Sequence, residues 1–197
     1  GAGLAAGLAA ALRDQARATA ASAIDWPRGP GAILAGSCSA ATLQQLAALG
    51  DALPRRRLDP LRLARGSDEV AAAIDWARRH LGDRPLLIYA SAPPDEVASA
   101  QAALGRERAA QVIEEALRAI AVALAQAGAS RFVVAGGETS GAVVQALDVR
   151  ALRIGPQIDP GVPWTETVEA EPVAITLKSG NFGAPDFFAK ALALLGD

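Results

Sequence analysis

Two short glycine-rich segments hold most of the residues that could do chemistry in this 197-residue chain. The first is Gly136-Gly-Glu-Thr-Ser-Gly141, which follows the apolar run 131–135, and the second is Lys178-Ser-Gly-Asn-Phe-Gly183, which follows 173–177. A turn of small residues between a strand and a helix leaves backbone N–H groups unpaired at the positive end of the helix dipole. Such a turn binds anions, most commonly phosphate. The two segments therefore predict a site for a phosphorylated ligand, and a nucleotide is the interpretation that we favour.

The side chains of these segments add hydroxyl groups, a carboxylate and a cation. Thr139 and Ser140 supply hydroxyl donors, and Glu138 could reach a phosphate-bound metal ion directly or through water. Lys178 ends an otherwise apolar strand, where a lysine is costly unless it has a task. Each feature also has a plain structural interpretation. The first turn could simply connect a strand to a helix, Glu138 could favour the helix dipole, and Lys178 could extend from a sheet edge into solvent.

A third turn of the same kind, Gly36-Ser-Cys-Ser39, precedes a helical pattern. Ser37 is a candidate ligand-binding hydroxyl, although Ser37 or Ser39 could instead cap that helix. Cys38 and the single histidine, His80, do not suggest a nucleophilic pair, because His80 lies at a helix end beside two arginines. The chain has no Cys/His cluster with the spacing of a metal site.

The elements that must position these turns alternate between strand and helix. Apolar runs predict strands, and 3.6-residue periodicity predicts helices. The strands are expected at 31–35, 85–91, 131–135 and 173–178, with possible strands at 57–63, where Pro60 favours an edge or bulge, and at 150–154. The helices are expected at 3–22, 40–49, 68–81 with Ser67 as N-cap, 106–127, 139–147 and 185–195, and a loop at 155–165. This order predicts a three-layer α/β/α sandwich with a mostly parallel sheet, whose carboxyl edge gathers the three turns.

Composition excludes several classes of function. The net charge of −2 leaves no broad basic surface for nucleic acid. No apolar stretch reaches the roughly 18 residues that span a bilayer, and a single cysteine excludes an internal disulfide and fits a reducing compartment. We expect a cytoplasmic protein with neither nucleic-acid nor membrane partners. Because the chain has no methionine, we also expect it to be a piece of a longer protein.

Taken in order, the segments resemble the C-terminal nucleotide-binding domain of the four-carbon acid sugar kinases. The resemblance covers nearly the whole chain, and the stretch 149–164 is closest to the 3-oxo-tetronate kinases. The residues that carry it are Gly36-Ser-Cys-Ser39 with Thr42 and Gln45, Leu104-Gly-Arg-Glu-Arg108, 136–144, 155–163, Leu177-Lys-Ser-Gly-Asn-Phe-Gly183 and Asp186-Phe-Phe188. The chain departs from the family at Gln157, where the family more often has Glu.

The resemblance implies that residues 1–197 form a single nucleotide-binding domain, the C-terminal part of a two-domain kinase. Such a kinase uses ATP and Mg²⁺ to phosphorylate 3-oxo-tetronate, threonate or erythronate. The catalytic residues and most contacts to the sugar acid are then expected in the other domain, and this fragment alone is expected to be inactive. The residues expected to bind ATP or ADP are Ser37, Gly136, Gly137, Glu138, Thr139, Ser140, Gly141, Lys178, Ser179, Gly180 and Asn181.

Alternatives stay open at this point. The domain could be a non-catalytic structural or dimerisation module whose turns only connect strands, and a homodimer is possible in either case. An aldolase or isomerase is disfavoured, since Lys178 and Lys190 are the only lysines that could form a Schiff base. The charged segment Leu104–Arg108 could be a solvated first helical turn or a contact to another domain.

Overall fold

One twisted sheet organises the molecule in the computed structural model, which describes residues 24–66 and 68–195. Within those residues, seven strands lie in the order β2-β3-β1-β4-β7-β6-β5. The first five are parallel, whereas β6 and β5 run antiparallel at one edge. Their bounds are β1 (Gly31–Ala35), β2 (Arg55–Arg57), β3 (Leu86–Tyr89), β4 (Arg131–Ala135), β5 (Leu152–Asp159), β6 (Val162–Thr167) and β7 (Ala174–Lys178).

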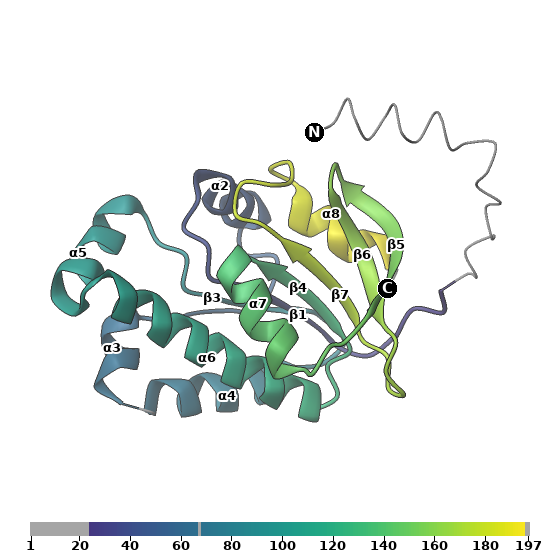
Figure 1. Cartoon of the computed structure of the whole chain (residues 1–197), viewed down its shortest axis with the longest axis horizontal. Coiled ribbons are helices and arrows are strands. Elements are labelled where there is room, and N and C mark those ends of the chain that lie inside the picture. The colour runs from purple at the N-terminus through teal and green to yellow at the C-terminus, as the bar shows by residue number, and fades with distance from the viewer. Residues whose placement is uncertain (1–23, 67, 196–197) are drawn as a thin grey trace.

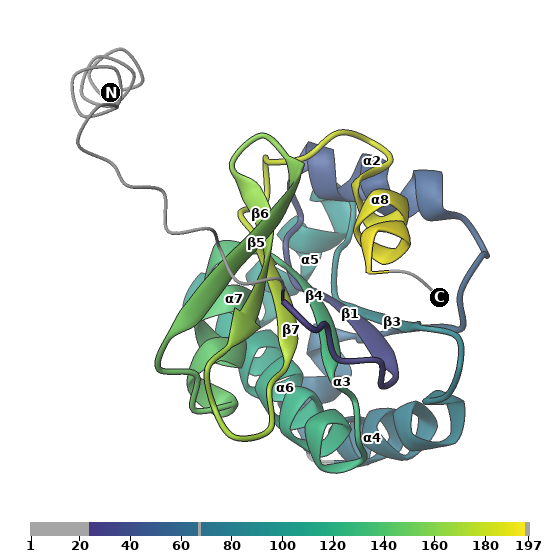
Figure 2. The ribbon, with the colours of Figure 1, turned by 90° about the vertical axis from the view of Figure 1, so that its right-hand side faces the viewer.

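Helices cover both faces of this sheet, which confirms the predicted α/β sandwich (Figures 1 and 2). They are α2 (Ala40–Leu49), α3 (Pro60–Arg65), α4 (Asp68–His80), α5 (Pro94–Leu104), α6 (Arg106–Gln126), α7 (Gly137–Ala146) and α8 (Phe187–Leu194). The helix expected at 3–22 and the N-cap expected at Ser67 lie outside the described residues.

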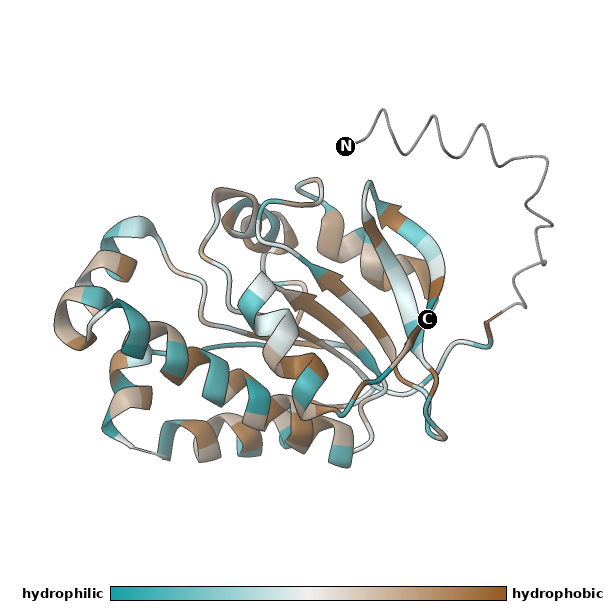
Figure 3. Ribbon diagram, viewed as in Figure 1, coloured by the Kyte–Doolittle hydropathy of each residue, from teal (hydrophilic) through white to brown (hydrophobic). Residues whose placement is uncertain are grey.

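Alternation along the strands builds two separate cores. In β1, Leu34 packs on the face covered by α6 and α4, whereas Ile33 packs on the face covered by α2 and α8. Successive side chains of a strand point to opposite faces, so a parallel strand buried on both sides must be apolar at every position. Hydrophobic and hydrophilic residues alternate along α6 (Figure 3), because only one side of that helix meets the sheet.

The expected strand at 57–63 is wrong for most of its length. Strand β2 ends at Arg57, and α3 begins at Pro60. The carboxylate of Asp59 accepts a hydrogen bond from the backbone N–H of Leu61 at 2.8 Å, and so caps the helix. Proline suits the first turn of a helix, where its missing N–H costs nothing. Pro60 therefore starts a helix and does not disturb a strand.

The expected loop at 155–165 is also wrong, because these residues belong to a β-hairpin. The possible strand at 150–154 is the beginning of β5, which continues to Asp159 before β6 starts at Val162. The turn is Pro160-Gly161, with Gly161 at φ +79°. The pairing of β5 with β6 shifts register on both sides of Gln157. Such an irregular edge pair accommodates prolines that an interior strand would not tolerate.

Candidate functional site

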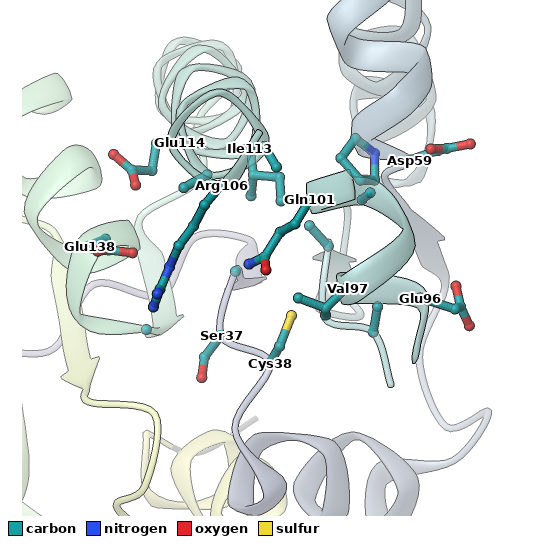
Figure 4. Close-up of a pocket in the computed structure, with 18 of the residues that line it drawn as sticks. Ser37, Cys38, Asp59, Glu96, Val97, Gln101, Arg106, Ile113, Glu114 and Glu138 are labelled. Atoms are coloured by element: carbon teal, nitrogen blue, oxygen red, sulfur yellow. The ribbon is translucent and has the colours of Figure 1, made fainter. Parts of the chain in front are cut away.

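A cavity of about 880 Å³ opens at the carboxyl ends of β1, β3 and β4. Its size lies in the range of small-molecule sites. The loop after β1, the start of α7, one side of α5 and the first turns of α6 form its walls (Figure 4). Ligands of open α/β sheets bind at this edge because the connections to the next helices splay apart there.

The start of α7 supplies unpaired backbone donors to this cavity. Ser140 is the first residue whose N–H donates within the helix, to the carbonyl of Gly136 at 2.8 Å. The amides of Gly137, Glu138 and Thr139 therefore lack intrahelical acceptors, and all three residues line the cavity. Gly136 has φ +129°, and a Cβ there would come within 3.2 Å of the backbone nitrogen of Ser37. The turn thus requires glycine and leaves three N–H groups available to an anion.

The turn after β1 is tied to the turn after β4. The N–H groups of Gly36 and Ser37 both donate to the carbonyl of Ala135, at 3.0 and 3.2 Å. The Ser37 hydroxyl accepts from the N–H of Ser39 at 3.2 Å, while Ser37 and Cys38 line the cavity. These contacts hold the two turns side by side, and together the turns form one wall of the cavity.

Charged side chains gather at the end of the cavity beside α7. Figure 4 shows Arg106, Glu114 and Glu138 there, with the Arg106 side chain reaching from α6 toward Ser37 and Glu138. Burial, and then the negative charges of Glu138 and Glu115, raise the pKa of Glu114. The carboxylate of Glu114 is therefore in a site that would favour a cation.

One stretch of the cavity wall, between α3, α5 and α6, is apolar, although charged side chains from α5 line the cavity beside it. This stretch includes Leu61, Val97, Ala100 and Ile113. Gln101 points into the same space (Figure 4), where its side-chain amide could hydrogen-bond to polar atoms at the edge of a bound ring. A planar aromatic ring with polar atoms at its rim fits such a lining.

The turn that follows β7, residues 178–183, lies next to the turn that follows β1 but does not line the cavity. Lys178 follows the β7 positions Ala174 and Thr176, so alternation turns its side chain toward α2 and α8. Lys178 is fully buried, and its Nζ donates to Thr42 Oγ1 and to the Gly180 carbonyl, both at 3.0 Å. The extension into solvent considered from the sequence is therefore wrong. Burial lowers the pKa of Lys178 to about 8.

Helix α2 holds the carbonyl groups of this second turn. The hydroxyls of Ser39 and Thr42 donate to the Gly180 carbonyl, at 2.5 and 3.1 Å. Gln45 Nε2 lies 3.0–3.1 Å from the carbonyls of residues 182, 183 and 184. A Cβ on Gly180 would come within 2.5 Å of the Ser37 hydroxyl. The second turn therefore packs directly against Ser37, without lining the cavity itself.

The structure brings some of the expected ligand residues together and leaves others apart. Those that line the cavity are Ser37, Gly136, Gly137, Glu138 and Thr139, and those that do not are Ser140, Gly141, Lys178, Ser179, Gly180 and Asn181. Sequence reasoning did not assign Arg106 or Glu114 to the ligand site. Their spacing of eight residues, close to two helical turns, was a signal that both lie on one face of α6.

Two kinds of feature are absent from the described residues. No helix in ranges 24–66 and 68–195 is long and apolar enough to cross a membrane. Nor does that part of the chain gather three or more His, Cys, Asp or Glu side chains around a possible metal ion.

Comparison with known proteins agrees with this geometry. A family model described as a nucleotide-binding C-terminal domain matches residues 32–188. A 3-oxo-tetronate kinase of Cupriavidus necator is 53% identical over 203 residues, an alignment that covers 100% of this chain and 46% of the relative. A 3-oxo-tetronate kinase of Burkholderia multivorans is 53% identical over 198 residues, covering 99% of this chain and 46% of the relative. The chain thus spans about half the length of these curated relatives.

A solved structure shares the fold. The crystal structure of a Haemophilus influenzae protein of the DUF1537 family model superposes with a TM-score of 0.87 at 35% identity, covering 99% of this chain and 47% of that protein. The resemblance drawn from the sequence motifs is confirmed: the chain belongs to the family of nucleotide-binding C-terminal domains, and its relatives include 3-oxo-tetronate kinases.

Proposed function

We propose that this chain is the ATP-binding domain of a two-domain kinase that phosphorylates a four-carbon sugar acid. The observation that carries the proposal is the cavity at the start of α7, which combines three unpaired N–H groups with an apolar wall. The 3-oxo-tetronate kinases among the relatives make 3-oxo-tetronate the first candidate substrate. Threonate and erythronate are the other candidates.

The proposed pose follows from the lining. The phosphates would accept hydrogen bonds from the amides of Gly137, Glu138 and Thr139 and from the Ser37 hydroxyl. The base would lie against the apolar wall that includes Val97. Residues 178–181, which pack against Ser37, would hold it in place. Lys178 would act as a positioning residue, because its Nζ donates a hydrogen bond to the Gly180 carbonyl.

Glu138 and Glu114 fit a divalent cation at the same end of the cavity. Carboxylate oxygens are preferred Mg²⁺ ligands, and Mg²⁺ sites in kinases usually combine one or two carboxylates with phosphate oxygens. The raised pKa of Glu114, caused in part by the charge of Glu138, indicates that a cation beside them would be favoured. The ion would neutralise negative charge on the phosphates. Glu138 and Glu114 would orient it, directly or through water.

The sugar acid would be held mainly by the other domain, and its hydroxyl would meet the nucleotide across a cleft. The isolated chain would then bind ATP and ADP without transferring phosphate. Release of ADP that depends on a four-carbon acid, catalysed by residues 1–197 alone, would contradict this division of labour. A homodimer stays a prediction, which analytical ultracentrifugation of the purified protein would check.

The experiment that tests the site is a titration calorimetry series on the purified protein with a matched pair of variants. Gly137→Asp places a carboxylate among the phosphate-binding amides, and a side chain at Gly137 meets nothing within 4 Å. Gly141→Asp adds the same group on the same helix, also in open space but outside the cavity lining.

We expect saturable ATP binding in the wild type and in Gly141→Asp, and loss of binding in Gly137→Asp. Equal affinities for ATP in all three proteins would show that the nucleotide does not bind at the start of α7. A folded wild type that shows no binding at millimolar ATP would instead favour the structural module.

A further inference from the structure

The charges that line the cavity are unbalanced. Carboxylates come from Asp59, Asp95, Glu96, Glu114 and Glu138, while the lining cations among the described residues are Arg57 and Arg106. Arg57 forms an ion pair with Glu96, and this contact raises the pKa of Arg57. Within ranges 24–66 and 68–195, the guanidinium of Arg106 has neither an ion pair nor a hydrogen bond. Arg106 is therefore the lining cation that is free to receive a ligand.

Local structure aims Arg106 across the cavity. Gly105 is both the C-cap of α5 and the N-cap of α6, and its φ of +81° allows the abrupt change of direction between the two helices. Arg106 is the first residue of α6, so its long side chain starts at the cavity rim. Figure 4 shows it crossing the open space toward Ser37 and Glu138, beside the unpaired amides of α7.

In this place the guanidinium of Arg106 is better suited to bind a phosphate than to pair with one of the nearby carboxylates. Its planar fork of donors matches two phosphate oxygens at once. Glu138 lies nearby, but it forms no ion pair with Arg106 among the described contacts. The terminal phosphates of a nucleoside triphosphate carry charge that the partial charges of helix amides offset only in part.

We propose that Arg106 binds the β- and γ-phosphates of the nucleotide and so makes the site select di- and triphosphates over monophosphates. This assignment rests on the proposed function, since it takes the cavity to be the nucleotide site. It predicts a specific pattern of affinities. Loss of Arg106 weakens the binding of ligands that carry phosphates beyond the first, and leaves the contacts of the base unchanged.

The test is calorimetric titration of ATP, ADP and AMP, with MgCl₂ present, into four versions of the full-length protein. They are the wild type, Arg106→Ala, Arg106→Lys and Arg108→Ala. Arg108 is the matched control, because it lies on the same helical turn, hydrogen-bonds to Gln111 and pairs with Glu115, and is not part of the cavity lining.

We expect Arg106→Ala to weaken ATP and ADP by about 10- to 100-fold, the range of a lost charge-assisted contact. AMP should weaken by less than about 2-fold, and Arg106→Lys should recover part of the loss, since a point charge replaces a fork. Arg108→Ala should leave all three affinities unchanged.

Several results would overturn the proposal. Wild-type affinity for ATP in Arg106→Ala, with the fold intact by thermal unfolding, would mean that Arg106 only offsets the charges of Glu114 and Glu138. An equal loss for ATP, ADP and AMP would place Arg106 on another part of the ligand. If the wild type binds ATP but the variants do not differ, the Arg106 assignment fails alone. If the folded wild type binds no nucleotide, the proposed function fails with it.

Discussion

Replacing Lys178 by methionine should remove a large pH dependence from the stability of the domain. Lys178 is fully buried, and the partners of its Nζ are neutral oxygens of Thr42, Ser179 and Gly180. Burial lowers its pKa from 10.5 to about 8. Between these values the unfolded chain holds a proton that the folded chain has released, so the free energy of unfolding rises with pH. This difference in the pKa of Lys178 between the folded and unfolded chain corresponds to a gain of about 2.5 kcal/mol in the free energy of unfolding between pH 7 and pH 10.

Urea unfolding at several values between pH 7 and pH 10, in wild type and Lys178→Met, measures this gain. The difference between the two proteins cancels the contributions of the other titratable groups, which the substitution leaves in place. We expect the wild type to gain stability relative to Lys178→Met as the pH rises. Parallel curves, or a relative loss for the wild type, would refute the conclusion that Lys178 is a buried cation without a carboxylate partner among the described residues.

Three further substitutions test the local geometry. Gly141→Ala should raise the free energy of unfolding by about 0.5–1 kcal/mol in urea titrations, because Gly141 lies inside α7 and its Cβ would meet nothing within 4 Å. A loss of stability would contradict this. Gly36→Ala should lower the free energy of unfolding by about 1–3 kcal/mol in the same assay, since its Cβ would lie 2.2 Å from the Thr139 hydroxyl; an unchanged value would show that the turns can separate. Glu138→Gln should lower the pKa of Glu114, measured by carboxyl NMR titration, because the charge of Glu138 raises it; an unchanged pKa would mean that Glu138 does not contribute to the shift.

The regular elements could be predicted from the sequence wherever one physical signal dominated. An apolar stripe predicted the long helix at 106–127, and α6 spans Arg106–Gln126. The residues of that stripe are Val112, Ile113, Leu117, Ile120 and Leu124. The apolar runs that became β1 and β4 were found at their observed bounds. These segments are long or apolar enough that no local alternative competes.

The errors arose where a local signal had two meanings. Pro60 was taken as a strand disruptor, although it starts α3 after the capping residue Asp59. The prolines at 155–165 suggested a loop, yet this edge hairpin accommodates them. Helix α5 was not predicted, and its single buried residue, Ala100, explains why its apolar periodicity is weak.

Predicting the site required knowledge of how elements pack. The glycine turns were visible because they require glycine for local reasons, such as the φ of +129° at Gly136. Arg106 reaches the cavity only because α6 begins beside the turn before α7. No local pattern in the sequence predicts that these two segments meet. For Lys178, alternation along β7 tells which side chains share its face, but not which helices cover that face.

The most direct test of the central claim is a crystal structure of the full-length protein with Mg²⁺ and a non-hydrolysable ATP analogue. The account predicts the phosphates within hydrogen-bond distance of the amides of Gly137, Glu138 and Thr139, and the base against the wall that includes Val97 and Ile113. An analogue bound outside this cavity, for instance on the α2 side of the turn that follows Lys178, would contradict it.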